Sequence, residues 1–175
     1  DSLAVSLGTE NRYDAVGNVG VDRTAARAFL ESLGHFRVGE LSSALYGEVA
    51  WKPLAGLRVT GGLRGDYYHY SVRARDSVAA SLGEGSGSAS ILSPKASIAY
   101  QVTPHLELYA NWGRGFHSND VRGAVNRDTP VPVLVRGIGK ELGGRIQFSG
   151  VTLTATYWWL HVGSELRFIG DSNAV

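Results

Sequence analysis

The stretch His117-Ser118-Asn119-Asp120 places the three residue types of a nucleophilic hydrolase next to one another in the sequence. A catalytic triad needs these side chains to converge from separate positions, so that the base reaches the nucleophile and the acid orients the base. Adjacent residues at the point where a strand passes into a loop do not converge in that way. We therefore expect no catalytic residue here, and we expect that the protein is not an enzyme.

Other patterns that could hold a cofactor are incomplete. The glycine-rich stretches at 83–88 (GEGSGS) and 137–144 (GIGKELGG) lack the full fingerprint of a phosphate-binding or dinucleotide-binding loop, and turn and strand glycines explain them. The five histidines show no metal-ligand spacing, and there is no cysteine to supply a thiolate. The sequence predicts no cofactor and no resident metal, although loop histidines could touch a metal chelate.

Composition narrows the class of protein. The chain has 175 residues, enough for one domain, and its formal net charge of +1 comes without any run of basic residues, so we expect no nucleic-acid partner. No stretch has the roughly 18 apolar residues that a membrane-spanning helix needs, but strands can also cross a membrane. The start lacks a methionine and a signal segment, which indicates a piece of a longer protein.

Apolar and polar residues alternate in seven runs, the pattern of β-strands with one apolar and one polar face. The predicted strands lie near 2–12, 37–51, 57–72, 89–101, 106–117, 136–148 and 151–168.

The connections between these strands alternate in length. Tight turns at 52–56, 102–105 and 148–150 alternate with long connections at 14–35, 73–89 and 118–135. In an up-and-down meander, all the tight turns would then lie at one end and all the long loops at the other, as in outer-membrane barrels. Residues 22–34 (DRTAARAFLESLG) predict a short helix inside the first long loop, covering the barrel mouth.

The polar faces of the runs carry charges of both signs, which a watery lumen tolerates and a dry core does not. We expect Leu63, Ile98, Leu108 and Ile146 to face lipid, and Arg64, Lys95, Glu107 and Arg145 to face the lumen.

Aromatic residues gather near the strand ends, as in the two interfacial girdles of a membrane barrel. Trp51, Tyr100 and Phe148 lie toward the tight turns, and Tyr67, Trp112, Phe116 and Trp159 lie toward the long loops. Cross-strand aromatic packing in any sheet is the simpler alternative explanation for this clustering.

The stretch 91–123, ILSPKASIAYQVTPHLELYANWGRGFHSNDVRG, resembles the barrel region of TonB-dependent outer-membrane receptors. The stretches GLRGDYYHY (62–70), KELGGRIQF (140–148) and YWWLHVGSELRFIGDSNAV (157–175) also look like consecutive strands of that family. The likeness covers the chain from about residue 37 onward.

The resemblance implies an all-β fold: an antiparallel up-and-down meander of about seven strands, part of a large transmembrane β-barrel, with one short helix in a long loop. Residues 1–175 would form a partial barrel domain, without the family's plug domain and remaining strands. The implied function is energised, TonB-dependent uptake of a scarce nutrient such as a ferric siderophore, vitamin or glycan. A non-transporting small outer-membrane barrel, or a soluble structural or adhesive β-domain, is the alternative.

The implied location is the bacterial outer membrane. The implied partners are outer-membrane lipid, the TonB complex through the missing plug region, and a small-molecule nutrient or metal chelate. Ligand-binding candidates, chosen on the lumen wall and outer loops, are Arg64, Asp66, Tyr109, Asn111, His117, Asn119, Asp120 and Arg122.

Overall fold

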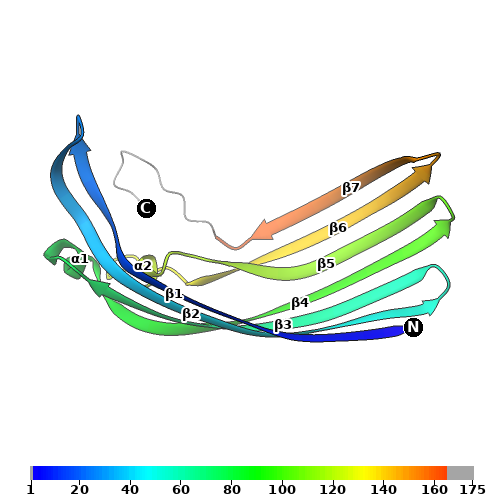
Figure 1. The fold of residues 1–175 in the computed structure, drawn as a ribbon, viewed down its shortest axis with the longest axis horizontal. Helices are drawn as coiled ribbons and strands as arrows, with labels where there is room; N and C mark the ends of the chain where they lie inside the picture. The colour runs from blue at the N-terminus through cyan, green and yellow to red at the C-terminus, as the bar shows by residue number, and fades with distance from the viewer. Residues whose placement is uncertain (1, 165–175) are drawn as a thin grey trace.

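The computed structural model describes residues 2–164 and forms one antiparallel sheet of seven strands (Figure 1). Each strand pairs with its sequence neighbours, in the order β1 to β7, which confirms the predicted meander. The elements are β1 (Leu3–Ala25), β2 (Ala28–Leu54), β3 (Leu57–Ala74), α1 (Ser77–Leu82), β4 (Gly85–Thr103), β5 (Leu106–Ser118), α2 (Val121–Ala124), β6 (Leu134–Phe148) and β7 (Val151–Val162). The end of the predicted strand 151–168 lies outside the described residues.

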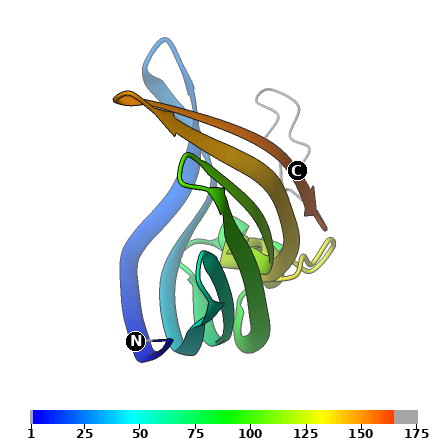
Figure 2. The ribbon, with the colours of Figure 1, turned by 90° about the vertical axis from the view of Figure 1, so that its right-hand side faces the viewer.

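The sheet curves into a trough, a half-barrel, and both helices lie inside the curve (Figure 2). Among the described residues, β1 and β7 each pair on one side only, so they form the two edges of an open sheet. In the described part of the chain, neither helix has the length and apolar character needed to cross a bilayer.

The three predicted tight turns lie at one end of the trough, the right-hand end in Figure 1. Gly56 and Gly150 adopt positive φ angles of 80° and 82° in two of these turns, a conformation that glycine reaches without steric cost. The second and third long connections lie at the opposite end, as predicted, but the predicted long connection at 14–35 is wrong: this segment is strand on both sides of a tight turn at that same end.

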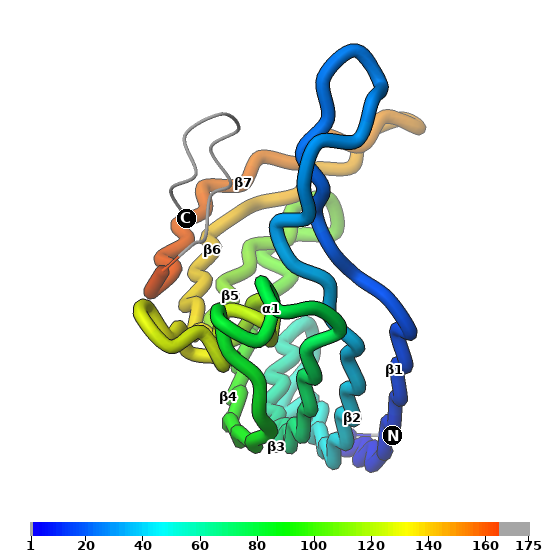
Figure 3. Tube along the Cα trace, turned by 90° about the vertical axis from the view of Figure 1, so that its left-hand side faces the viewer, coloured from blue at the N-terminus to red at the C-terminus, as the bar shows by residue number. Residues whose placement is uncertain are grey.

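The predicted helix at 22–34 is wrong, because this segment forms the tip of a long β-hairpin (Figure 3). The turn is tight: Ala26 and Arg27 both have positive φ, 48° and 68°, as in the turns that suit the twist of a hairpin. The flanking residues pair across it, with Arg23 opposite Glu31. The ladder satisfies backbone groups of both strands, and this overrides the helix propensity of the alanine-rich sequence.

Short helices occur instead in the second and third long connections. Helix α1 follows Asp76, whose side chain caps it, and α2 follows Asp120. The described residues thus contain two short helices, neither of them where the sequence pattern indicated.

The two faces of the sheet differ in composition and burial. Cross-strand partners share a face, and the register places Leu63 opposite Pro94 and Arg64 opposite Ser93. The buried strand residues, such as Val72 and Asp66, lie on the face where the helices pack, which we call the inner face. On the outward face Leu63, Ile98, Leu108 and Ile146 remain 46–53% exposed.

Candidate functional site

The inner face of β1 to β3 is joined by ion pairs centred on Arg64. Its guanidinium lies 2.8 Å from a carboxylate oxygen of Asp66 and 2.8 Å from one of Glu10, and it also lies over the Tyr46 ring. Only 3% of the Asp66 side chain is exposed, so removing Arg64 would leave a buried carboxyl group without its partner. Arg64 therefore has a structural role as well as a position on the lumen side.

A second pair crosses a whole strand. The Lys95 ammonium on β4 lies 2.5 Å from the Glu48 carboxylate on β2, with Gly62 of β3 between them in the register. A Cβ atom at Gly62 would come within 2.7 Å of the lysine Cε. Because Gly62 has no side chain, the Lys95 side chain has room to cross β3 and reach Glu48.

Tyr109 on β5 repeats this arrangement over Gly143 of β6. A Cβ atom at Gly143 would lie 2.4 Å from the tyrosine Cζ, and the hydroxyl reaches Thr156 Oγ1 of β7 at 2.5 Å. Nearby, the Asn111 amide donates to the Glu141 carboxylate at 3.0 Å. The inner face of β5 to β7 is therefore polar and ordered by side-chain hydrogen bonds.

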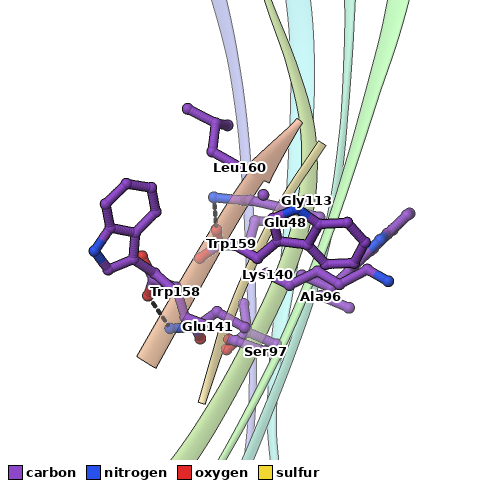
Figure 4. A pocket seen from close by; sticks show the side chains of 14 residues that line it. Glu48, Ala96, Ser97, Gly113, Lys140, Glu141, Trp158, Trp159 and Leu160 are labelled. Carbon is purple, nitrogen blue, oxygen red and sulfur yellow. Dashed lines mark hydrogen bonds and ion pairs between the residues drawn. The ribbon is translucent and has the colours of Figure 1, made fainter. Parts of the chain in front are cut away.

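These groups border a hollow of about 650 Å³ (Figure 4). Polar lining residues from the inner face include Glu48, Lys95, Asn111 and Glu141. Trp158 pairs with Glu141 in the register, is 65% exposed, and points to the opposite side of β7 from Trp159. A polar surface beside an exposed indole can bind a ring-containing polar ligand through hydrogen bonds and stacking.

At the end of the trough where the second and third long connections lie, which we call the mouth, the inner face is covered by an apolar cluster. Phe36, Val38 and Val72 from the strands pack with Ala79 of α1, Val121 of α2 and Val133. This apolar cluster holds the second and third long connections against the inner face.

Asp76 anchors the α1 connection to β2. Its carboxylate accepts hydrogen bonds from the backbone N–H of Ala79 at 2.7 Å, the Ser32 hydroxyl at 3.0 Å and the backbone N–H of His35 at 3.1 Å. The hydrogen bond from Ala79, followed by those from Ser32 and His35, lowers the pKa of Asp76 below its ordinary value. The anchor is therefore charged at neutral pH.

The loop candidates form a separate group. The Asn119 side chain donates to the Pro132 carbonyl at 2.8 Å, and the Asp120 carboxylate accepts from both the backbone and the guanidinium of Arg122. Burial raises the pKa of Asp120, but the hydrogen bonds from Arg122 outweigh it, and the net pKa is lowered. His117, half-buried at the end of β5, pairs with Val135 in the register.

The structure thus divides the eight sequence candidates into three groups: Arg64 with Asp66, Tyr109 with Asn111, and His117 with the loop residues that follow it. Sequence reasoning left out Glu48, Lys95, Glu141 and Trp158 as candidate ligand contacts. Alternation already indicated that the three charged residues point inward. The same alternation, followed along the strand from the outward-facing Val151, also predicts that Trp158 points inward and Trp159 outward.

Comparison with known proteins agrees with this architecture. The family model described as "TonB dependent receptor-like, beta-barrel" matches residues 4–174. No protein with curated annotation matches the chain.

Solved structures of uptake receptors share the fold. The ferric yersiniabactin uptake receptor FyuA from Yersinia pestis superimposes with a TM-score of 0.75 at 16% identity, over 93% of this chain and 26% of that one. The ferric-catecholate import receptor Fiu from E. coli K12, in its open form, gives 0.64 at 14% identity, over 91% of this chain and 27% of that one. The chain thus spans about a quarter of the length of these receptors. At such identities the likeness concerns the fold, while the family match covers nearly the whole chain. The chain therefore belongs to the TonB-dependent receptor-like β-barrel family, a family of receptors and transporters rather than enzymes.

Proposed function

We propose that the chain is part of a bacterial outer-membrane receptor that takes up a scarce nutrient in a TonB-dependent way. The observation that carries this proposal is the two-faced half-barrel, with exposed apolar side chains outside and a hydrogen-bonded polar wall inside. A sheet of this kind is stable with lipid on one side and water on the other. The seven described strands would form one part of the wall of a larger barrel.

The nutrient class we propose is a small polar molecule or metal chelate, such as a ferric siderophore, vitamin or glycan. Family membership and the likeness to FyuA and Fiu, both iron-chelate receptors by name, support an uptake role. The inner wall offers both hydrogen-bond donors and acceptors: Lys95 and Asn111 donate, and Glu48 and Glu141 accept. Tyr109 and Arg64 would contribute from the same wall, and the buried Asp66 would hold Arg64 in place.

Capture would begin at the mouth. His117, Asn119, Asp120 and Arg122 lie in or beside the third long connection, where a ligand arriving from outside would first meet the receptor. Transport would then need the TonB complex, acting through a plug domain.

The test is nutrient uptake by the complete receptor in its host. A strain without the receptor gene should lose uptake of one member of a panel of iron chelates, cobalamin and oligosaccharides, and the cloned gene should restore it. Uptake that persists in a strain without TonB, or no loss for any panel member, would contradict the proposal.

Neighbouring aromatic residues provide a matched pair of variants. Trp158→Ala removes an aromatic ring from the inner face, whereas Tyr157→Ala removes one from the outward face of the same strand, away from the residues that line the hollow. With the nutrient identified above, we expect Trp158→Ala to raise the dissociation constant of the purified receptor about tenfold or more, through lost stacking. Tyr157→Ala should leave the dissociation constant unchanged.

A further inference from the structure

The outward face of β3 to β7, and of β2 from His35 onward, carries Lys and Arg but no Asp or Glu. By strand alternation, the outward Lys and Arg residues of β3 to β7, and of β2 from His35 onward, are Arg37, Arg73, Arg114, Arg136 and Lys140. No Asp or Glu shares that face within those described strands. The inner face, in contrast, mixes both signs in ion pairs such as Lys95 with Glu48.

Two of these arginines face each other directly. Arg37 of β2 and Arg73 of β3 are Cα partners, both are exposed, and within residues 2–164 neither forms an ion pair. Like charges directly opposite one another in a sheet are destabilising. Stability of the sheet therefore does not explain the pair, whereas an anion between the two guanidinium groups would.

The arginines share a hollow of about 420 Å³ whose floor is made of small residues. Ala15, Gly17, Gly39 and Ser71 leave room for a ligand, and the Tyr13 ring forms one side. Glu84, which lines the adjacent hollow with Arg73, is engaged by the backbone N–H of Ala74 at 3.1 Å.

The height of the hollow fits the headgroup layer of a membrane. From Trp51 to Leu41, β2 covers about 33 Å along the strand at about 3.3 Å per residue. A tilt of about 45° projects this to about 23 Å, close to the roughly 25 Å apolar band of a membrane barrel. Arg37 lies about 9 Å further by the same estimate, just beyond the exposed ring of Tyr13.

We propose that Arg37 and Arg73 bind the phosphate of an anionic lipid headgroup in the outer leaflet. This inference rests on the membrane placement in the proposed function. Guanidinium groups suit phosphate because they donate two parallel hydrogen bonds. Elsewhere on the outward face, Lys140 lies 5.0 Å from the Trp159 ring centre and Arg114 lies 5.9 Å from that of Trp112. Cations beside aromatic rings are typical of the membrane interface.

The test is selective lipid retention by the complete receptor, purified in detergent and followed by native mass spectrometry. The probes are phosphatidic acid and phosphatidylcholine with the same acyl chains, and inorganic phosphate. We expect the wild type to retain phosphatidic acid about tenfold better than phosphatidylcholine, in line with charge-assisted hydrogen bonds. The variant Arg37→Gln/Arg73→Gln should lose this preference, and Arg37→Lys/Arg73→Lys should keep part of it.

The matched control is Arg12→Gln/Arg58→Gln, which removes the same charge from the inner face and should retain the wild-type preference. Equal retention of both lipids by the wild type, or an unchanged preference in the Gln variant with heat-modifiable gel migration showing a folded barrel, would overturn the proposal. Binding of inorganic phosphate without selective lipid retention would overturn it as well. Nutrient uptake by the wild type is measured in parallel. A wild type that takes up no nutrient would refute the proposed function. A wild type that takes up the nutrient but does not prefer phosphatidic acid would refute only this lipid site.

Discussion

The same strands present two faces that obey opposite rules. On the outward face large apolar side chains such as Leu45 and Leu92 stay 65% and 57% exposed. On the inner face charges of both signs form ion pairs, such as Lys95 with Glu48, and Asp66 is almost completely buried. In a soluble protein the apolar residues would be buried and the charges exposed. The reversal shows that this sheet is built for a solvent that is apolar outside and aqueous inside.

The largest effect that this contrast predicts is on solubility. Residues 1–175 expressed alone should aggregate in water, because the outward faces of seven strands make an apolar patch far larger than the few hundred Å² usual for soluble monomers. The two strand edges add unpaired backbone groups. Size-exclusion chromatography with and without detergent checks this prediction, and a monodisperse, cooperatively melting monomer in water would support the soluble alternative instead.

Arginine substitutions test the two faces one at a time. Leu63→Arg places a charge on the outward face of β3, midway between Tyr67 and the residue opposite Trp51, and we expect it to lower the free energy of unfolding by about 2–4 kcal/mol. Asn111→Arg on the inner face should cost far less, because water surrounds the new charge and Glu141 lies beside it. Urea unfolding of the complete receptor in lipid vesicles measures both. Equal costs would count against a membrane barrel.

On the inner face, Arg64 pairs with one buried carboxylate, Asp66, and one exposed carboxylate, Glu10. Asp66→Asn should lower the free energy of unfolding by about 1–3 kcal/mol, because it leaves Arg64 without its buried carboxylate. Glu10→Gln removes the other partner, whose side chain is 62% exposed, and should cost less than about 1 kcal/mol. If the two variants unfold at the same urea concentration, burial does not govern the strength of these ion pairs.

The smallest effect is expected at the mouth, where low pH should weaken the hydrogen bonds that Asp76 accepts. The pKa of Asp76 is lowered in the folded state, so its contribution is fully present above the ordinary Asp pKa of about 3.9 and is lost as the pH falls through the folded value. Hydrogen exchange, corrected for intrinsic rates, should therefore show lost protection at the Ala79 and His35 amides only below about pH 4. Asp76→Asn should abolish the pH dependence, and an unchanged profile in that variant would exclude Asp76 as its source.

Much of the fold could be predicted because the two-residue alternation is local. The strands around Leu63 and Leu108, their faces, the three predicted tight turns and the second and third long connections are confirmed. The failure at 22–34 has a different origin, since the ladder with β1 lies outside any local window. The helix at Asp76 was missed because six residues are too few to show a period.

For the candidate site, the sequence predicted only which way each side chain points. Alternation indicated that Arg64 and Tyr109 point inward, but which partners they meet depends on register. Glu48 meets Lys95 only because β3 places Gly62 between them, and Trp158 joins the Glu141 hollow only through the pairing of β6 with β7. The ligand-binding role of all eight candidates stays a prediction.

By itself, the sequence determined an all-β meander with one apolar and one polar face, because side-chain direction in a strand follows from position along the chain. Tertiary structure decided which side chains meet across strands, because the register of residues far apart in sequence is set by the whole ladder. It also decided that Arg37 lies opposite Arg73, and that the second and third connections fold onto the inner face through the Val72 and Val121 cluster. Both depend on contacts between distant segments, which a local pattern does not contain.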